Sequence, residues 1–400
     1  MNMTTKNNVF ARYLSEYLKA TEERKGEILD HVCDVTKVHR KSAIRKFAKL
    51  QMNGGVLFDK RGRKTYYTSD VTLALKTVWE ATSELCGELV YPVIEEYVAI
   101  LRRDGMWPHS EEATDKLLRM SGATVKRRVA IFMGAKEPKK GKSATSPSKL
   151  KEIIPIFTGP WKDKPPGFGQ IDTVVHCGSS LLGDMAFSVN FTDISTLWLS
   201  LAAQWNKGQR ATTASLQRIE GKVPFPILGM HPDTGSEFIN WFLKAWADGR
   251  HIELTRSRPN HKNDNAYVEQ KNGHVIRRFL GYARIDQPEV IEKMNGLYDV
   301  LELYLNHFVA SRKCLEKVRV GSKYRKTYDK GKPAYRRVLA SPDISDEVKD
   351  KLKAEHETLN PLILKRRIDT LTHELFTLNR QLREPVTEVV QEELVGNLLF

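Results

Sequence analysis

Apolar residues recur at helical spacing near the start of the chain and form two stripes. These stripes are Ile28, Leu29 and Val32, followed by Ala43, Ile44, Phe47 and Leu50. Intervals of three and four residues are typical of helices with one buried face. Segment 23–50 therefore predicts two helices around a tight turn.

The second of these helices is basic at the positions outside its apolar stripe. Those positions hold Arg40, Lys41, Arg45 and Lys46. We expect a helix-turn-helix whose basic recognition helix lies in the major groove of DNA. A basic, solvated helix in an ordinary helical bundle is the alternative interpretation.

A short basic segment separates this pattern from a second helical region. Lys60, Arg61, Arg63 and Lys64 surround Gly62 there. Such a segment suits an arm in the minor groove of DNA, and a basic linker is the alternative. Helical spacing then continues from 70 to 129.

Segment 110–132 repeats the layout of a helix, a glycine-containing turn and a basic helix. The turn falls at Gly122, and the following helix carries Lys126, Arg127 and Arg128. Two such units in tandem favour DNA binding, because the contact can be spread over both. Residues 136–152 are then rich in Lys, Ser and Pro and nearly free of large apolar side chains, which indicates a linker.

Beyond the linker the pattern changes to strands alternating with helices. The predicted elements are three strands within 167–178 and 185–204, a helix at 208–221, a strand at 225–231, a helix within 233–249, a strand at 251–257 and a helix from about 264. The helix within 233–249 has Phe238, Trp241, Phe242 and Ala245 at helical spacing, and Gly249 is a plausible stop. This order is that of a ribonuclease-H-like α/β domain, with a mixed five-stranded sheet and flanking helices.

Two patterns mark the C-terminal part. Segment 310–339 is strongly basic with Tyr324, Tyr328 and Tyr335 interleaved, which favours a third DNA contact or, alternatively, a basic extended loop. Leucine and isoleucine then recur in a heptad seam: Leu364, Ile368, Leu371, Leu375, Leu378 and Leu382. The seam spans less than three heptads, so we expect it to pack on its own chain rather than pair two subunits.

Composition adds a preference for a polyanionic partner. The chain has 64 Lys and Arg against 49 Asp and Glu, a net charge of +15, and such a balance favours nucleic acid through counterion release. Apolar content of 40% and charged content of 28% are those of a globular protein without a membrane partner. With no visible secretory signal, we expect a cytoplasmic, nucleoid-associated bacterial protein whose four dispersed cysteines are reduced.

Three acids occupy informative places in the predicted α/β order. Asp172 lies inside the first strand, where a carboxylate is costly to bury without a cation or donors. Asp233 follows a strand directly, at the end where open α/β sheets present their sites. Glu269 lies in the last helix, and residues 234–268 separate it from Asp233. Acids on separate elements can converge, although three unrelated surface or capping acids are the alternative.

Converging carboxylates suit chemistry at a phosphodiester. Hydrolysis or transfer there requires charge neutralisation at the attacking and leaving oxygens, which two divalent ions with hard oxygen ligands can supply. We expect two Mg²⁺ or Mn²⁺ ions, with Asp172 bridging them and with Asp233 and Glu269 completing one site each. Of the other acids, Asp264 is expected to be the N-cap of the last helix.

Three short motifs carry a family resemblance: "QID", "HPDTGSEF" and "NDNAYVEQKN". With 35 residues between the second and third acids, segment 165–285 resembles the Asp-Asp-Glu catalytic core of the retroviral integrase superfamily, closest to bacterial insertion-sequence transposases. One departure is Thr234, where that family commonly has Asn. The resemblance implies a transposase that binds terminal inverted repeats, cleaves the DNA ends and joins the freed 3′-hydroxyls to target DNA as a homo-oligomer.

Two other functions stay open beside this one. A ribonuclease-H-like nuclease would cut without joining, and a transposase-derived regulator would bind DNA without chemistry. Basic and amide residues around Glu269 are candidate DNA contacts, with solvated faces as the alternative. They are Lys262, Asn265 and Lys271 on the DNA end and Arg277 and Arg278 on backbone phosphates.

The chain thus divides into five expected parts. They are a helix-turn-helix domain with a basic arm (1–64), a second helical domain (65–135), a basic linker (136–164), the catalytic core (165–285) and a C-terminal basic and helical region (286–400).

Overall fold

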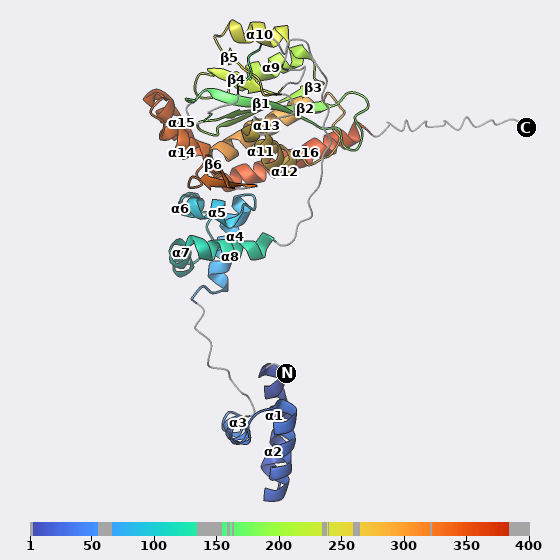
Figure 1. Ribbon diagram of the computed structural model, residues 1–400, viewed down its shortest axis with the longest axis vertical. Coiled ribbons are helices and arrows are strands. Elements are labelled where there is room, and N and C mark those ends of the chain that lie inside the picture. The colour runs from blue at the N-terminus through green and yellow to red at the C-terminus, as the bar shows by residue number, and fades with distance from the viewer. Residues whose placement is uncertain are drawn as a thin grey trace, which may run out of the picture. The chain divides into compact units, whose positions relative to one another are not determined.

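The computed structural model describes residues 3–54, 66–133, 154–157, 161, 164–233, 238, 240–258, 265–320 and 322–383. The chain forms two units, residues 1–66 and 67–400, each with its own core. Figure 1 shows both units and labels their elements. The basic arm at 60–64 and most of the predicted linker at 136–164 lie outside the described residues.

The first unit is a bundle of three helices. These are α1 (Met3–Lys19), α2 (Glu22–Thr36) and α3 (Arg40–Met52). The two predicted helices are therefore present, and Lys37 ends α2 in a left-handed conformation at φ 52°. Phe10 of α1 joins the two predicted stripes in one core, but Ile44 is 44% exposed and is not part of it. The prediction for Ile44 was wrong because α1 packs over Ala43 and Phe47 instead.

The second unit begins with five helices. They are α4 (Ser69–Ala81), α5 (Gly87–Val90), α6 (Ile94–Arg103), α7 (Glu111–Leu118) and α8 (Gly122–Met133), with a 3-10 turn, η1 (Tyr91–Val93), between α5 and α6. Helices α5 and α8 approach closely, because a Cβ on Gly87 would lie 2.6 Å from the Lys126 Cα. Phe308 and Ala310, far along the chain, complete the core of these helices. The Tyr304 hydroxyl also donates to the Ala81 carbonyl at 2.7 Å.

A mixed five-stranded sheet forms the centre of this unit, as predicted. Its strands are β1 (Phe168–Val175), β2 (Ala186–Asp193), β3 (Leu199–Trp205), β4 (Gly229–Pro232) and β5 (Glu253–Leu254). The spatial order is β3-β2-β1-β4-β5, with β1, β2 and β3 antiparallel and β4 and β5 parallel to β1. This arrangement is compatible with a ribonuclease-H-like core.

Helices cover both faces of the sheet (Figure 1). One face carries α9 (Gln209–Glu220) and α10 (Trp241–Asp248), and the other carries α11 (Ala266–Lys271), a π-helix (Asn272–Ile276), α12 (Arg277–Leu280) and α13 (Val290–Phe308). Two separate cores result, because alternate strand residues point to opposite faces.

The buried face of α10 differs from the predicted one. Trp241 and Phe242 are 59% and 52% exposed, whereas Leu243 and Trp246 are buried. The helix begins only at Trp241, where the Asn240 side chain accepts from the Leu243 N–H at 2.9 Å. Phe238 therefore precedes the helix and does not share a helical stripe with the residues that follow.

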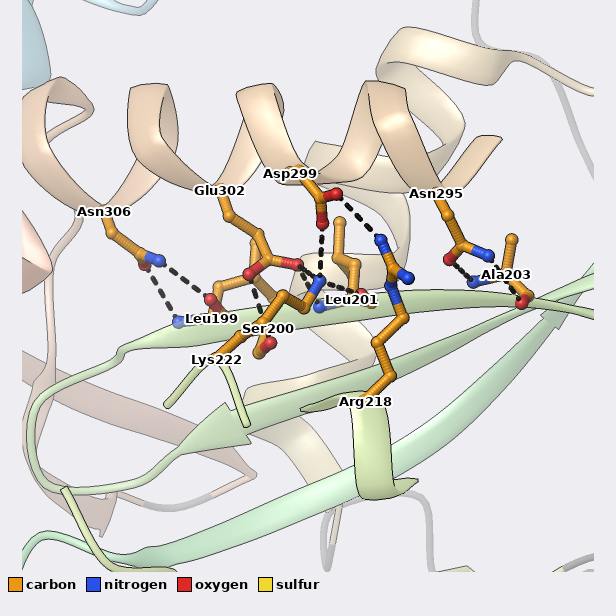
Figure 2. Close-up of polar contacts among 10 residues, drawn as sticks. All are labelled: Leu199, Ser200, Leu201, Ala203, Arg218, Lys222, Asn295, Asp299, Glu302 and Asn306. Atoms are coloured by element: carbon orange, nitrogen blue, oxygen red, sulfur yellow. Dashed lines mark hydrogen bonds and ion pairs between the residues drawn. The ribbon is translucent and has the colours of Figure 1, made fainter. Parts of the chain in front are cut away.

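Strand β3 lies at the edge of the sheet, and α13 covers that edge. Asn306 exchanges two hydrogen bonds with the Leu199 backbone, accepting from its N–H at 2.9 Å and donating to its carbonyl at 2.8 Å. Asn295 makes the same pair of contacts with Ala203, at 2.8 and 3.3 Å. Figure 2 shows these side chains along the strand. Side-chain amides thus occupy the positions of a sixth strand.

The central backbone groups of this edge are satisfied by an ion pair. Glu302 accepts from the Leu201 N–H at 2.7 Å, and Lys222 of the α9–β4 segment donates to the Leu201 carbonyl at 2.6 Å (Figure 2). The two side chains meet at 2.5 Å. Burial raises the pKa of Glu302 to about 7, although Lys222 and the Leu201 N–H act in the opposite direction.

The C-terminal part adds a hairpin and three helices. They are β6 (Cys314–Val320), β7 (Lys323–Tyr328), α14 (Ala334–Leu339), α15 (Asp346–Thr358) and α16 (Pro361–Gln381). The predicted basic loop is thus largely an antiparallel hairpin, and Tyr335 is buried rather than available for DNA. Helix α16 packs on α13 through the seam from Leu364 to Leu378, as predicted for packing on its own chain. Leu382 was wrongly assigned to the seam, because it follows the end of the helix and is 41% exposed. Among the described residues, no helix is long and apolar enough to cross a membrane.

Candidate active site

The first two acids of the predicted triad lie on neighbouring parallel strands. The register of β1 and β4 pairs Ile171 with Pro232. Asp172 is the next residue on β1, and Asp233 directly follows the last residue of β4, so the two acids occupy equivalent positions beside the carboxyl end of β4. This placement follows from strand pairing, because parallel strands in register carry successive residues side by side.

The third acid, Glu269, lies on a helix that is docked on the face of β1 to which Asp172 points. The Gln170 side-chain oxygen accepts from the N–H groups of Tyr267 and Val268, at 2.9 and 3.2 Å. These are among the N–H groups that have no partner inside α11. Gln170 and Asp172 are two residues apart on one strand, so they point to one face. Glu269 therefore lies in the first turn of a helix fixed beside Asp172.

Helix α11 begins later than the sequence predicts. The residue in the N-cap position is Asn265, without a side-chain cap, and Asp264 lies outside the described residues. After one turn the helix widens into the π-helix at Asn272–Ile276. Such π turns are frequent at functional sites, and here one begins at the residue that reaches Asp172.

A buried amide network that sequence reasoning missed orients Asp172. Asn272 donates to Asp172 Oδ2 at 2.6 Å, while the Thr173 N–H donates to Oδ1 at 2.8 Å. Asn190 on β2, directly opposite Asp172 in the sheet, donates in turn to Asn272 at 3.0 Å. Three polar residues could have indicated this network from the sequence. They are Gln170 and Asn190, inside predicted strands, and Asn272, the last residue of "NDNAYVEQKN".

The three acids are coupled electrostatically. Burial, the charge of Asp233 and, to a smaller degree, the charge of Glu269 raise the pKa of Asp172 to about 7. The Thr173 and Asn272 hydrogen bonds lower this pKa only in part. A carboxyl with so high a pKa, surrounded by like charges, is a recognised mark of a functional site. The structure thus places Asp172 beside the end of β4, which Asp233 follows, and Glu269 on the helix docked against β1.

Carboxylate oxygens of this kind are the donors that Mg²⁺ and Mn²⁺ prefer. The donor set therefore fits a hard divalent cation, and the unfavourable like charges would be neutralised by one. Across the residues that the structure describes, no three carboxylate, imidazole or thiol groups already stand in ligating geometry. The segments next to Asp233 and before α11, residues 234–237 and 259–264, are outside those residues.

The predicted DNA contacts differ in their surroundings. Arg61, Arg63 and Lys262 lie outside the described residues. Six side chains are exposed, as a contact requires: Arg40, Lys41, Arg45, Lys126, Arg127 and Arg278. Of these, Arg40 forms an ion pair with Asp30 across the turn between α2 and α3.

Four of the basic candidates, the exposed Lys126 among them, have partners within the chain. Lys46 donates to Asn7 at 3.1 Å and lies 4.8 Å from the Phe10 ring centroid, so it joins α3 to α1. Lys126 pairs with Glu88, and Arg128 binds Thr72 and the Tyr67 carbonyl. Arg277 donates to the Val175 carbonyl at 2.8 Å and so holds the end of β1. Each of these side chains thus has an intramolecular partner, and its contact with DNA stays a prediction.

The two remaining candidates lie on or before α11. Asn265 is only 5% exposed, and neither atom of its amide has a hydrogen-bond partner within the described part of the chain. A buried amide does not support the expected surface contact with DNA. Lys271 is partly buried, and burial, with a smaller contribution from the charge of Arg337, lowers its pKa to about 8.

Comparison with known proteins gives three findings. The HTLV-2 integrase catalytic core domain in complex with magnesium is similar in its dimeric form at 14% identity and TM-score 0.28, over 37% of this chain and 91% of that one. Its trimeric form is similar at 15% identity and TM-score 0.27, over 36% and 86%. No protein-family model matches the sequence.

A comparison with curated sequences found a relative that matches most of the chain. "Uncharacterized protein y4rM" of Sinorhizobium fredii (strain NBRC 101917 / NGR234) is 33% identical over 329 residues. The match covers 82% of this chain and 93% of that protein. The protein therefore belongs to the same family as y4rM of Sinorhizobium fredii.

Proposed function

We propose that the protein is a DNA transposase that cleaves the ends of a mobile element and joins the freed 3′-hydroxyls to target DNA. One observation carries this proposal. Asp172 and Asp233 stand at equivalent positions on neighbouring parallel strands, and Glu269 is docked beside Asp172 on α11. The basic net charge of +15 and the sequence resemblance to Asp-Asp-Glu transposases support DNA as the substrate.

Asp172, Asp233 and Glu269 would hold two divalent ions, Mg²⁺ or Mn²⁺. Bound there, the ions would activate the attacking oxygen and neutralise charge on the leaving oxygen. Asp172 would serve both ions, because Asp233 and Glu269 flank it from the end of β4 and from α11. Asn272 would keep one Asp172 oxygen oriented, and Gln170 would keep α11 at a constant distance from the sheet.

Cleavage and joining would both be in-line attacks at phosphorus, so one acidic site can serve both steps. In the first step water is the nucleophile, and in the second the freed 3′-hydroxyl replaces it. The exposed basic residues of α3 and α8, among them Arg45 and Arg127, would contact the terminal DNA. A homo-oligomer on paired ends is part of this proposal.

Three single substitutions test the proposal: Asp172→Asn, Asp233→Asn and Glu269→Gln. We expect each to lower cleavage and strand transfer by more than about 100-fold, because each removes a ligand charge that the transition state requires. The substrates are duplexes that carry the sequences bordering the coding region, with a plasmid as target and with Mg²⁺ or Mn²⁺. Gel analysis separates nicked, cleaved and joined products.

A matched control is Asp184→Asn, which removes an exposed acid of the same domain. It should leave cleavage and joining unchanged, and all four variants should keep wild-type binding to the terminal duplex. Wild-type joining in any of the three triad variants would contradict the assignment. Cleavage without joining in the unaltered protein would favour the nuclease, and binding without any metal-dependent product would favour the regulator.

A further inference from the structure

The β6–β7 hairpin is a two-stranded ribbon that is exposed on both faces. Every residue of β7 is exposed, and on β6 the side chains of Val318 and Val320 are 44% and 60% exposed. Within the described part of the chain, these two strands form a sheet of their own. An isolated ribbon of this size is marginally stable in water, so its retention requires a firm base or a partner.

The base of the ribbon is firmly fixed. Asp329 accepts from the Lys313 N–H at 2.7 Å and forms a buried ion pair with Arg337 of α14. Ser311 and Lys332 close the base with a backbone bridge, each N–H donating to the other carbonyl at 3.1 Å. The ribbon is thus held rigidly at one end and presents its length to solvent.

The two faces of the ribbon differ in chemistry. Opposite residues in the register share a face, so Arg319 and Tyr324 lie together with Lys326 and Tyr328. We call these four residues the basic-aromatic face. The other face carries Glu316, Val318, Val320, Lys323, Arg325 and Thr327. The basic-aromatic face therefore has both tyrosines and no acid, whereas the opposite face includes Glu316.

The ribbon starts beside the sheet that carries Asp172. Lys313, directly before β6, donates to the Ser195 carbonyl at 3.1 Å, two residues after the end of β2, and β2 pairs with β1. At the same end, Arg312 stands 5.2 Å from the Tyr328 ring centroid and pairs with Glu88 of α5 at 2.6 Å. Figure 1 shows β6 at this side of the core. DNA that leaves the acidic site can therefore continue along the ribbon.

We propose that the basic-aromatic face of the β6–β7 ribbon lies in the major groove of the DNA next to the scissile phosphate. This inference rests on the proposed function for the identity of the bound DNA. The major groove is about 12 Å wide and admits a two-stranded β-ribbon. Arg319 and Lys326 contact phosphates or base edges, and Tyr324 adds an aromatic contact.

Charge decides between DNA and a second copy of the chain as the occupant. Residues 314–328 contain Lys317, Arg319, Lys323, Arg325 and Lys326 against one acid, Glu316. Two copies paired through this ribbon would bring like charges together, which is unfavourable in strand pairs. A polyanion instead gains from the basic side chains that face it.

The test is duplex binding by the full-length protein. The variants are Arg319→Ala with Lys326→Ala, and Tyr324→Ala. The probe is a fluorescent 30-base-pair duplex of mixed sequence, about three helical turns, measured by anisotropy over a salt series. We expect the double variant to bind on the order of tenfold or more weakly, with the slope of log affinity against log salt reduced by about two. Tyr324→Ala should weaken binding without changing that slope.

The matched control is Lys323→Ala with Arg325→Ala, which removes the same charge from the opposite face of the same ribbon. Binding within about threefold of wild type is expected there, since neither side chain enters the groove. Equal losses from both pairs would reject the face assignment, and wild-type binding by the first pair would reject the ribbon as a DNA contact. A changed oligomeric state by light scattering, with DNA affinity unchanged, would identify a second copy as the occupant.

The test of the ribbon can fail or succeed independently of the test of the proposed transposase activity. Asp172→Asn should bind the mixed-sequence duplex like wild type, so the ribbon can be tested in a protein without chemistry. Conversely, if the unaltered protein neither cleaves nor joins DNA while the Arg319 and Lys326 variant still loses affinity, the transposase proposal fails and the ribbon contact stands.

Discussion

Asp172 is the residue at which the electrostatics of the site are concentrated. Its pKa is raised to about 7 by burial and by Asp233 and Glu269, against the opposing hydrogen bonds from Thr173 and Asn272. Because the pKa in the folded state lies above that of an unfolded aspartate, this carboxyl favours folding at low pH and loses that contribution as pH rises through about 7. A bound divalent cation would reverse the trend, since it requires the ionised form.

The raised pKa of Asp172 predicts that the protein releases a proton when it binds a metal ion. At about pH 6 the Asp172 carboxyl is mostly protonated and should give up close to one proton to bind Mn²⁺, and at about pH 8 it should give up almost none. The apparent affinity for Mn²⁺ should therefore rise by up to about tenfold per pH unit below pH 7 and then level off. Calorimetric titration in two buffers of different ionisation enthalpy measures both quantities.

Asp172→Asn is the control for this residue. It should bind Mn²⁺ weakly at every pH and release no proton. Proton release that persists in this variant would assign the effect to another group, such as Asp193, whose pKa burial raises to about 6.

At the scale of elements, helix α13 has two functions in the fold. One side packs on α16 and the sheet. The other side presents side chains to the backbone groups of β3 that do not pair with β2. Edge strands with free N–H and carbonyl groups are templates for pairing with other chains. Asn295, Glu302 and Asn306 remove that possibility by satisfying the edge from within the molecule (Figure 2).

Asn306→Ala should therefore lower the free energy of unfolding by about 2–4 kcal/mol. It leaves the buried N–H and carbonyl of Leu199 without their partners, each at about 1–3 kcal/mol, and better helix propensity recovers a small part. Urea denaturation at constant pH measures the change. Glu292→Ala, on the exposed side of α13, is the matched control and should stay within about 0.5 kcal/mol. If Asn306→Ala also lowers the free energy of unfolding by less than about 0.5 kcal/mol, the hydrogen bonds to the strand edge do not stabilise the fold.

At the scale of the whole molecule, the chain consists of two units with separate cores. The core of the first unit comprises seven buried side chains: Phe10, Ile28, Leu29, Val32, Ala43, Phe47 and Leu50. A domain of this size buries a smaller fraction of its surface than a large one and is correspondingly less stable. The second unit combines the helical region, the sheet and the C-terminal helices through shared cores.

We predict that the two units unfold separately. All seven tryptophans belong to the second unit, the first of them at Trp79. In urea, the helical circular dichroism signal should therefore begin to fall before tryptophan fluorescence changes, because the small unit unfolds first and contains no tryptophan. Phe47→Ala should shift only the early circular dichroism phase. Coincident transitions by both signals, in wild type and in this variant, would contradict independent units.

Much of this architecture is readable from local pattern. Runs of β-branched and aromatic residues between turn signals predicted the five strands, and helical spacing predicted the helices between them. The candidate triad was proposed from sequence because Asp172 interrupts a strand and Asp233 follows another. The buried face of α10 was wrongly predicted, because apolar spacing alone does not reveal that Asn240 starts the helix after Phe238.

By itself, then, the sequence determined most helices and strands, their apolar stripes, the candidate acids and the basic character of the chain. Only the tertiary structure decided how each charge is used. Arg128 and Arg277 bind backbone carbonyls, Asn265 is buried, and the basic segment around Arg319 is an exposed ribbon. The physical reason is that helix and strand periods depend on near neighbours, whereas the partner of a charged or amide side chain is set by residues distant in the chain.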